Sequence, residues 1–116
     1  MKVNGVEFDI DFTDADTLEL IEKECKRVEE EAKELEEKKL ELSPAEGIRQ
    51  ECKIVKDFLD SVLGSGASEK IFGKKDSLNL CLDAYEEVLK AYQEQYKVYY
   101  DRINKYSPDR LKRWIC

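Results

Sequence analysis

The stretch SPAEGIRQECKIVKDFLDSVLG, residues 43–64, decides the fold that we expect for this chain. Ser43, Pro44 and Glu46 indicate a helix start, because serine caps the first turn, proline fits the first helical position and glutamate completes the capping box. The apolar residues that follow cover a wide helical arc: Ile48, Cys52, Val55, Leu59 and Val62 on one seam, with Ile54, Phe58 and Leu63 beside it. Such an arc predicts a helix over 44–63 that contacts neighbours on two sides and ends at Gly64 in a left-handed C-terminal cap.

The helix expected before this stretch spans residues 14–42 and carries a narrower apolar stripe. Thr13 or Asp14 can cap its start. Its apolar residues lie alternately three and four apart, interrupted only at Lys39: Leu18, Ile21, Cys25, Val28, Ala32, Leu35 and Leu42. The glutamate runs lie off this stripe, which places them on solvated faces. Since the turn to the next helix is short, the two helices are expected to pack antiparallel.

A third helix is expected over residues 77–106, ending before Pro108. One of its faces gathers the apolar and aromatic residues Leu78, Cys81, Leu82, Tyr85, Val88, Leu89, Tyr92, Tyr96, Tyr99 and Ile103. A last short helix over 108–115 is expected to set Trp114 against the end of the bundle. The whole chain, residues 1–116, is thus predicted to be one mainly α domain, an antiparallel three-helix bundle in which the second helix is the most buried.

The first twelve residues follow the two-residue period of a strand. The apolar residues that alternate with acidic ones are Val6, Phe8, Ile10 and Phe12. The Asn4-Gly5 pair just before them is a hairpin signal, so we expect a short hairpin or a single strand. A strand this short is not stable alone, so its apolar face must lie on the helices or pair with another chain. The second alternative makes Val6, Phe8 and Ile10 candidate partner-binding residues.

The stretch GSGASEKIFGKKD, residues 64–76, is expected to be a connector between the second and third helices. A phosphate-binding loop needs Gly-Lys-Ser/Thr after a buried strand, because backbone amides wrap the phosphates and the hydroxyl holds magnesium. Here a second lysine follows the Gly-Lys step and a helix precedes the loop, so no nucleotide is expected. The residues expected to shape the connector are Gly64, Gly66 and Gly73 at turns, and Ile71 and Phe72 as a buried plug of the bundle end.

The composition argues against nucleic-acid and membrane partners. Of the 116 residues, 41% are apolar and 41% are charged, the net charge is −7 and there is no histidine. A field of this sign repels nucleic acid. No apolar run approaches the roughly 18 residues of a membrane span, and the first residues alternate instead of forming a signal-peptide core. A soluble cytoplasmic protein is therefore expected.

The four cysteines do not form a metal-binding motif. They are Cys25, Cys52, Cys81 and Cys116, with no CxxC pair and no histidine to complete a mixed zinc site. The first three fall on apolar stripes, so they are expected to be free core thiols in a reducing cytoplasm. The chain also lacks a histidine base, a GxSxG motif and a Glu-x-x-His step, so we expect no catalytic residues, no metal and no cofactor.

A tyrosine-rich stripe on the third helix is the main candidate for a partner-binding surface. Its members are Tyr85, Tyr92, Tyr96, Tyr99, Tyr100 and Tyr106, of which Tyr92, Tyr96, Tyr99 and Tyr100 are the first candidates to bind a partner. A stripe at this spacing fits either a binding face or the core and rim of the bundle. The charge is also uneven, since residues 1–60 hold nineteen acids against ten bases and residues 61–116 hold eight against ten. Charge runs of this kind on long helices are usually solvated faces, and the alternative is an acidic partner for the C-terminal end or head-to-tail association, so a homo-oligomer is one arrangement that the sequence allows.

In the run VKDFLDSVLGSGASEKIFGKKDSLNLCLDAYEEVL, residues 55–89, a Phe/Leu-rich helix leads into Gly-x-Gly, then Lys-Ile-Phe-Gly, then a helix with an Ala-Tyr-Glu step. The positions that carry this pattern are Phe58, Gly64, Gly66, Lys70, Ile71, Phe72, Gly73, Leu78, Leu82, Ala84 and Tyr85. It resembles a pattern of small tail-morphogenesis proteins of Gram-positive phages and prophages, such as the tail assembly chaperones. The resemblance implies a non-enzymatic, phage- or prophage-encoded protein of the host cytoplasm that binds tape-measure or tail-tube proteins during assembly.

The resemblance leaves open whether the chain is the chaperone itself or another small protein of the tail module, because the acidic first helix and the basic C-terminal end lie outside the matching run. A stand-alone helical adaptor for protein–protein interaction is the main alternative. A secreted helical hairpin of the WxG type is disfavoured, since the turn reads LSPAEG and lacks Trp-x-Gly. An acidic mimic of nucleic acid is disfavoured by the basic C-terminal end.

Overall fold

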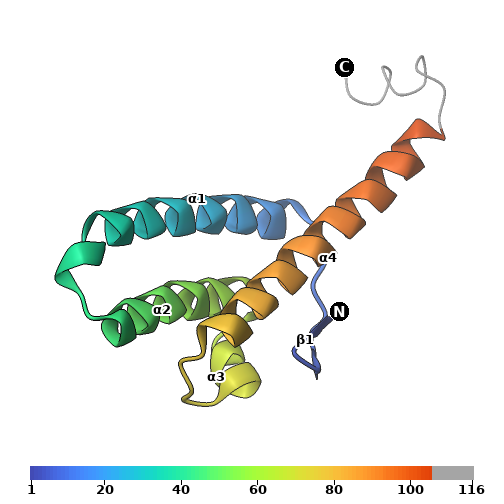
Figure 1. Ribbon diagram of the computed structural model, residues 1–116. Coiled ribbons are helices and arrows are strands. Elements are labelled where there is room, and N and C mark those ends of the chain that lie inside the picture. The colour runs from blue at the N-terminus through green and yellow to red at the C-terminus, as the bar shows by residue number, and fades with distance from the viewer. Residues whose placement is uncertain (106–116) are drawn as a thin grey trace.

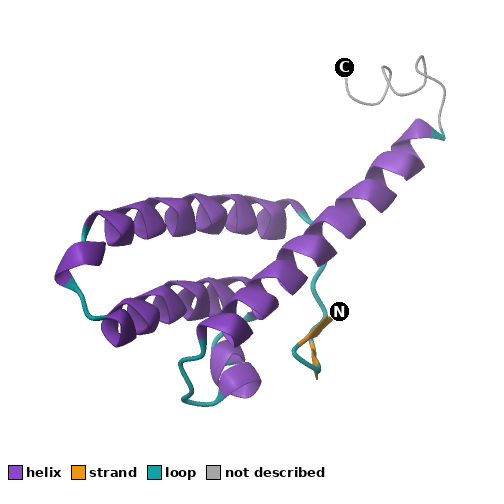
Figure 2. Cartoon of the chain, viewed as in Figure 1, coloured by secondary structure: helices purple, strands orange, loops and turns teal. Residues whose placement is uncertain are grey.

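The computed structural model describes residues 1–105, and the expected mainly α fold with a short N-terminal strand pair is confirmed (Figures 1 and 2). The elements are β1 (Lys2–Val3), β2 (Val6–Glu7), α1 (Ala15–Glu37), the 3-10 turn η1 (Lys39–Glu41), α2 (Pro44–Leu63), α3 (Ala67–Phe72) and α4 (Leu78–Asn104). The short helix expected over 108–115, with Trp114, lies outside the described residues.

Helices α1 and α2 form an antiparallel hairpin whose starts agree with the prediction. A carboxylate oxygen of Asp14 accepts a hydrogen bond from the Thr17 N–H at 3.2 Å, and the Ser43 hydroxyl oxygen accepts one from the Glu46 N–H at 3.2 Å. The predicted end of the first helix at residue 42 is wrong, because α1 ends at Glu37 and is followed by η1. The apolar stripe is interrupted there, so nothing apolar holds a further turn against α2.

Helix α2 is the centre of the fold, as predicted. It packs against both α1 and α4. Its five buried residues outnumber the three of α1 and the three of α4 within the described chain, and they are Cys52, Val55, Phe58, Leu59 and Val62. The Phe58 ring meets the Tyr85 ring of α4 edge-on, with centroids 4.9 Å apart. Phe58 therefore joins the hairpin to α4 at the middle of the core.

The prediction of a connector over residues 64–76 is wrong in one respect, because this stretch contains the short helix α3. Gly64 ends α2 with φ 115° and ψ 155°, a positive φ as expected but not the left-handed helical cap. Gly66 follows at φ 83°. Such angles strain any residue with a Cβ, so these two glycines turn the chain sharply from α2 into α3.

Helix α3 is held against α2 by a carboxylate and by an aromatic ring. Asp60 of α2 accepts hydrogen bonds from the N–H and the hydroxyl of Ser68, at 2.8 and 3.0 Å. The side chain of Phe72 is buried at 9% exposure, and Ile71 is half-buried. The predicted plug is therefore confirmed for Phe72 and partly for Ile71. Lys56 of α2 lies 5.9 Å from the centre of the Phe72 ring.

The N-terminal residues form the hairpin that Asn4-Gly5 predicted, with both turn residues at positive φ (49° and 82°). The paired strands are shorter than the apolar alternation, which continues to Phe12. Beyond Glu7, Phe8 extends the ladder by one more pair, since its N–H donates to the Met1 carbonyl at 2.8 Å and its carbonyl accepts from the Met1 amino group at 2.9 Å. Within the described chain, residues 9–12 have no strand opposite them, so this part of the chain continues as an extended segment without strand pairing.

Polar side chains of α4 fasten this N-terminal segment to the helix. A carboxylate oxygen of Glu87 accepts a hydrogen bond from the Asn4 N–H at 2.9 Å. Further along α4, Gln95 accepts from the Phe12 N–H at 2.7 Å and donates to the Ile10 carbonyl at 2.9 Å. Helix α4 runs obliquely across the α1–α2 hairpin, and its C-terminal half extends beyond it (Figure 1).

Candidate functional site

The apolar face of α4 has two halves with different surroundings. In the first half, Cys81, Ala84 and Val88 are completely buried. In the second half, Tyr96 and Tyr99 continue the same helical face at 44% exposure each, beyond the end of the hairpin. Within residues 1–105, close to half of each ring stays accessible, although Tyr99 shares a groove with Met1. One helical face is thus buried in the core in its first half and exposed in its second half, and the exposed half is a candidate interaction surface.

The aromatic rings on this half of α4 contact one another in a chain, which we call the tyrosine ladder: Tyr92, Tyr96, Tyr99 and Tyr100. Phe12 meets Tyr92 edge-on at 5.5 Å between centroids, and Tyr92 lies 6.3 Å from Tyr96. Tyr96 in turn lies 6.0 Å from Tyr99 and 6.1 Å from Tyr100. Neighbouring rings restrict each other's rotation, so the ladder loses little side-chain entropy when it is covered.

The structure thus brings the four predicted tyrosines together. Tyr92 is half-buried at the inner end of the ladder, and Tyr100 is 55% exposed at the outer end. Burial raises the pKa of the Tyr92 hydroxyl, and the nearby Glu22 carboxylate adds to the shift. Tyr92 therefore belongs partly to the core, whereas the other three form the free part of the ladder.

A groove of about 670 Å³ runs along one side of α4, between the helix and the N-terminal segment. Its apolar surface comes from Val98, Tyr99 and Ile103, and Met1 contributes from the opposite wall. Arg102 contributes a positive charge to the rim of this groove, and Asp11 and Glu94 contribute negative charges. Val98 is 60% exposed. This groove is open and mixed in charge.

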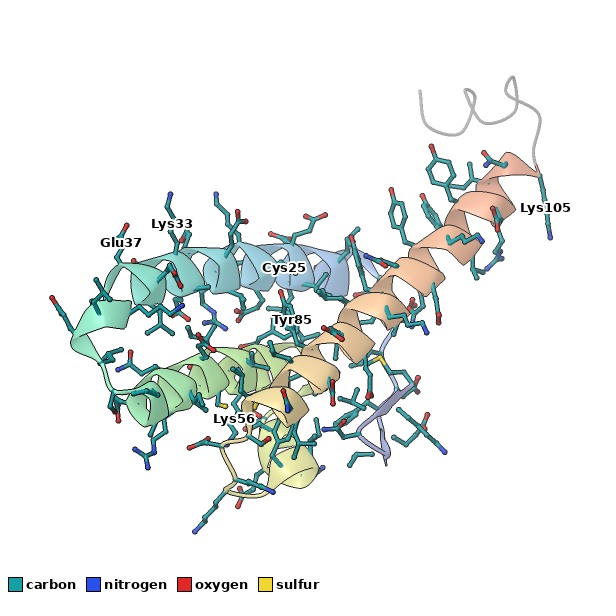
Figure 3. All side chains as sticks on the ribbon, viewed as in Figure 1. Cys25, Lys33, Glu37, Lys56, Tyr85 and Lys105 are labelled. Carbon is teal, nitrogen blue, oxygen red and sulfur yellow. The ribbon has the colours of Figure 1, made fainter. Side chains whose placement is uncertain are left out.

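A second groove, of about 370 Å³, lies on the other side of α4, where α1 approaches it; we call it the α1–α4 groove. Ile21 and Cys25 of α1 and Tyr92 of α4 form its apolar floor. Charged residues of α1, namely Glu22, Lys26 and Glu29, form its rim. Figure 3 shows Cys25 and Tyr85 in the space between the helices, and burial together with Cys25 and Glu29 raises the pKa of Tyr85.

The predicted N-terminal candidates, Val6, Phe8 and Ile10, are half-buried. Phe8 and Ile10 pack against the core, and their main-chain groups face Met1 and Gln95. The main-chain N–H and C=O groups of successive residues in a strand point to opposite edges. The groups that point outward here are therefore those of the intervening acidic residues, Glu7 and Asp9. Acidic side chains beside an edge disfavour pairing with another strand. The structure therefore separates these residues from the free half of α4, and their role in binding a partner stays a prediction.

The remaining predicted positions lie at the turns of the connector between α2 and α4. Gly64, Gly66 and Gly73 have positive φ, with open space where a Cβ would lie. No three His, Cys, Asp or Glu side chains gather to hold a metal ion within residues 1–105. In the same part of the chain, no helix is long and apolar enough to cross a membrane.

The thiols that the structure describes are free, and two of them are fully buried. Burial and a hydrogen bond with Cys52 raise the pKa of Cys81 to about 12. Burial also raises the pKa of Cys25, which is half-buried. Since the thiolate is the reactive form of cysteine, these groups are suited to the core and not to nucleophilic chemistry.

Sequence reasoning missed a polar cluster at the α1–α2 interface, formed by Glu24, Arg27 and Glu31 of α1 beside Ser61 of α2. Burial alone would raise the pKa of Glu24, but hydrogen bonds with Ser61 and Arg27 outweigh it and lower the pKa. The available signal was position: Glu24 follows Ile21 by three residues, on the inward side of α1.

A model of a protein family of unknown function, DUF6673, matches residues 4–114. The chain belongs to this family. The matched region contains the N-terminal fastening, the hairpin and the tyrosine ladder, so these features lie within the family's domain. No curated protein and no solved structure matches the chain.

Proposed function

We propose that this DUF6673 member is a non-enzymatic, chaperone-like protein of phage or prophage tail assembly, which binds a segment of a tape-measure or tail-tube protein in the bacterial cytoplasm. The observation that supports binding is the tyrosine ladder. It continues a core face of α4 into solvent over Tyr96, Tyr99 and Tyr100.

The exposed rings of the ladder would contribute binding energy when a partner covers them. Buried aromatic side chains contribute much of the binding energy at protein interfaces, because they cover large apolar areas with few rotatable bonds. The rings of the ladder are half-exposed and already in mutual contact. A partner that covers them gains this area at a small entropic cost.

The assignment to tail assembly is supported by the resemblance of residues 55–89 to tail-morphogenesis proteins. In the structure these residues form the end of α2, the two glycine turns, α3 and the first half of α4. These residues therefore hold α4 in place against α2. The ladder begins directly after them, on the same helix. On this proposal the resembling region is the scaffold and the ladder is the binding element.

Co-expression with the tape-measure and tail-tube proteins encoded beside this chain, followed by co-purification, tests the proposal. We expect one of them to be recovered with the wild-type chain and to be lost with Tyr96→Ser combined with Tyr100→Ser. The matched control is Leu82→Ser, which removes an apolar side chain of 42% exposure from the other half of α4. We expect it to retain the partner.

Recovery of neither tail protein by a correctly folded chain would contradict the assignment to tail assembly. In that case the stand-alone helical adaptor becomes the better description. Equal loss of the partner in the tyrosine variant and in the Leu82 control would contradict the role of the ladder.

A further inference from the structure

We infer that the α1–α4 groove, together with the tyrosine ladder, receives an amphipathic helix of the partner, and that lysine or arginine residues flank its apolar ridge on the side that faces α1. This inference rests on the proposed function and narrows it to one class of partner segment. Three observations support it: the shape of the apolar surface, the absence of free main-chain N–H and C=O groups along the interior of the two helices that form it within residues 1–105, and the acidic side chains at its edge.

The apolar surface is continuous from the groove to the free end of α4. It starts at Ile21 and Cys25 on α1, crosses the Tyr92 ring and continues over Tyr96 to Tyr100. Figure 1 shows that α1 begins beside the middle of α4 and runs away from its C-terminal half, so α1 flanks only the groove end of this surface and the ladder continues on α4 alone. The groove end, which lies between two helices, matches the ridge of a third helix.

Main-chain chemistry favours a helix over an extended strand at this surface. An added strand binds through the free N–H and C=O groups of a sheet edge. Here the surface is formed by α1 and α4 at the groove and by α4 alone at the ladder, and the interior main-chain groups of both helices already bond within the helix. A helical segment brings its own main-chain hydrogen bonds and needs only apolar contact from the surface.

The rim of the groove on α1 specifies the charge of that helix. Glu22 and Glu29 are exposed on either side of Lys26 and form no ion pair within residues 1–105. Helix α1 as a whole carries ten acidic residues against four basic ones. Complementary charge at the edge of an interface raises the association rate and excludes wrong partners. A lysine- or arginine-flanked helix therefore fits, and a glutamate-flanked one does not.

Two designed peptides test this inference with the full chain. Both have roughly 18 residues, about 27 Å of helix, and the same ridge of leucines. One has lysine on both flanks, and the other has glutamate at the same positions. We expect the lysine peptide to bind at least about tenfold more tightly by fluorescence anisotropy, and to shift the NMR signals of Cys25, Tyr92 and Tyr96.

Charge variants separate local complementarity from the general field of an acidic protein. Glu22→Lys combined with Glu29→Lys is expected to abolish or reverse the preference for the lysine peptide. The matched control, Glu30→Lys combined with Glu37→Lys, changes the net charge equally at exposed positions away from the groove and is expected to keep the preference.

Three results would overturn the inference: no binding of either peptide, equal binding of both, or the same loss of preference in the groove variant and in its control. None of these results would contradict the proposed function, because that function is tested separately by co-purification of the tail proteins. If those proteins are recovered through the ladder while the peptides fail, only the helical, basic partner segment is rejected.

Discussion

The side chain of Gln95 pairs with the main chain of the N-terminal segment as a neighbouring strand would, accepting from the Phe12 N–H at 2.7 Å and donating to the Ile10 carbonyl at 2.9 Å. The two partners lie more than eighty residues apart in sequence. This contact holds Phe12 in place under the Tyr92 ring, at the inner end of the ladder. It thus connects the N-terminal segment to the position of the candidate site.

Replacing Gln95 by alanine should release the N-terminal segment. The change leaves a partly buried N–H and C=O without partners, so we expect the free energy of unfolding to fall by about 1–3 kcal/mol. Urea denaturation measures this loss, and amide exchange at Phe12 should accelerate. Gln93→Ala, at an exposed position of the same helix, is the control and should change stability by less than about 0.5 kcal/mol. Equal effects of both variants would reject the fastening role.

Phe72 should be required for stability although it lies in a connector. Its side chain is buried and lies beside the Lys56 side chain. We therefore expect Phe72→Ala to lower the free energy of unfolding by about 3 kcal/mol. The neighbouring exposed Lys70→Ala is the control. A melting curve of Phe72→Ala that overlays the wild-type curve would show that the ring is not a plug.

The same connector should not bind nucleotide. Gly64 and Gly66 serve the turn into α3, whose six residues begin without a side-chain cap. Addition of ATP or GTP with magnesium is therefore expected to leave the melting temperature unchanged. A clear rise of the melting temperature with either nucleotide, lost in Gly66→Ala, would contradict this interpretation.

The fold could be predicted where the deciding signals are local. The start of α2 depends on Ser43 and Pro44, whose effects act within one turn. Its central place follows from the width of its own apolar arc. The end of α1 and the presence of α3 were missed because their local signals are weak. Near Glu37 the local signal is the break of the apolar stripe at Lys39, which no glycine or proline reinforces, and a helix of six residues is shorter than the window in which helical periodicity can be recognised.

The candidate site was predictable in part. The tyrosine ladder follows from helical spacing alone, because all its members share one helix. Its exposure depends on where the hairpin ends in space, which the sequence does not reveal. Gln95 and Glu24 were missed because a polar residue on a helix is usually solvated, and their partners come from other elements. Long-range polar contacts of this kind leave no periodic signal.

The buried thiols should be unreactive in the folded protein. Cys52 and Cys81 are fully buried, and the pKa of Cys81 is raised to about 12 by burial and by its contact with Cys52. In a Cys116→Ser background, we expect maleimide to modify Cys25 first and to reach the other two only after unfolding in urea. Mass spectrometry of the labelled peptides measures this order. Rapid labelling of Cys81 in the native protein would contradict the burial of this side chain.

Glu24 should make the stability depend on pH. Its folded-state pKa is lowered from 4.5, because the hydrogen bonds with Ser61 and Arg27 outweigh the effect of burial. A lowered pKa means that the ionised carboxylate stabilises the folded chain above the unfolded-state pKa, and that this contribution is lost as the pH falls through the folded-state pKa. We expect Glu24→Gln to be less stable than the wild type by about 1–2 kcal/mol at pH 7. This difference should shrink as the pH falls below about 4.5. Urea denaturation at several pH values measures both quantities, with the exposed Glu30→Gln as a control that should show no such dependence. A difference that stays constant from pH 7 to pH 3 would show that Glu24 acts by packing and not by its charge.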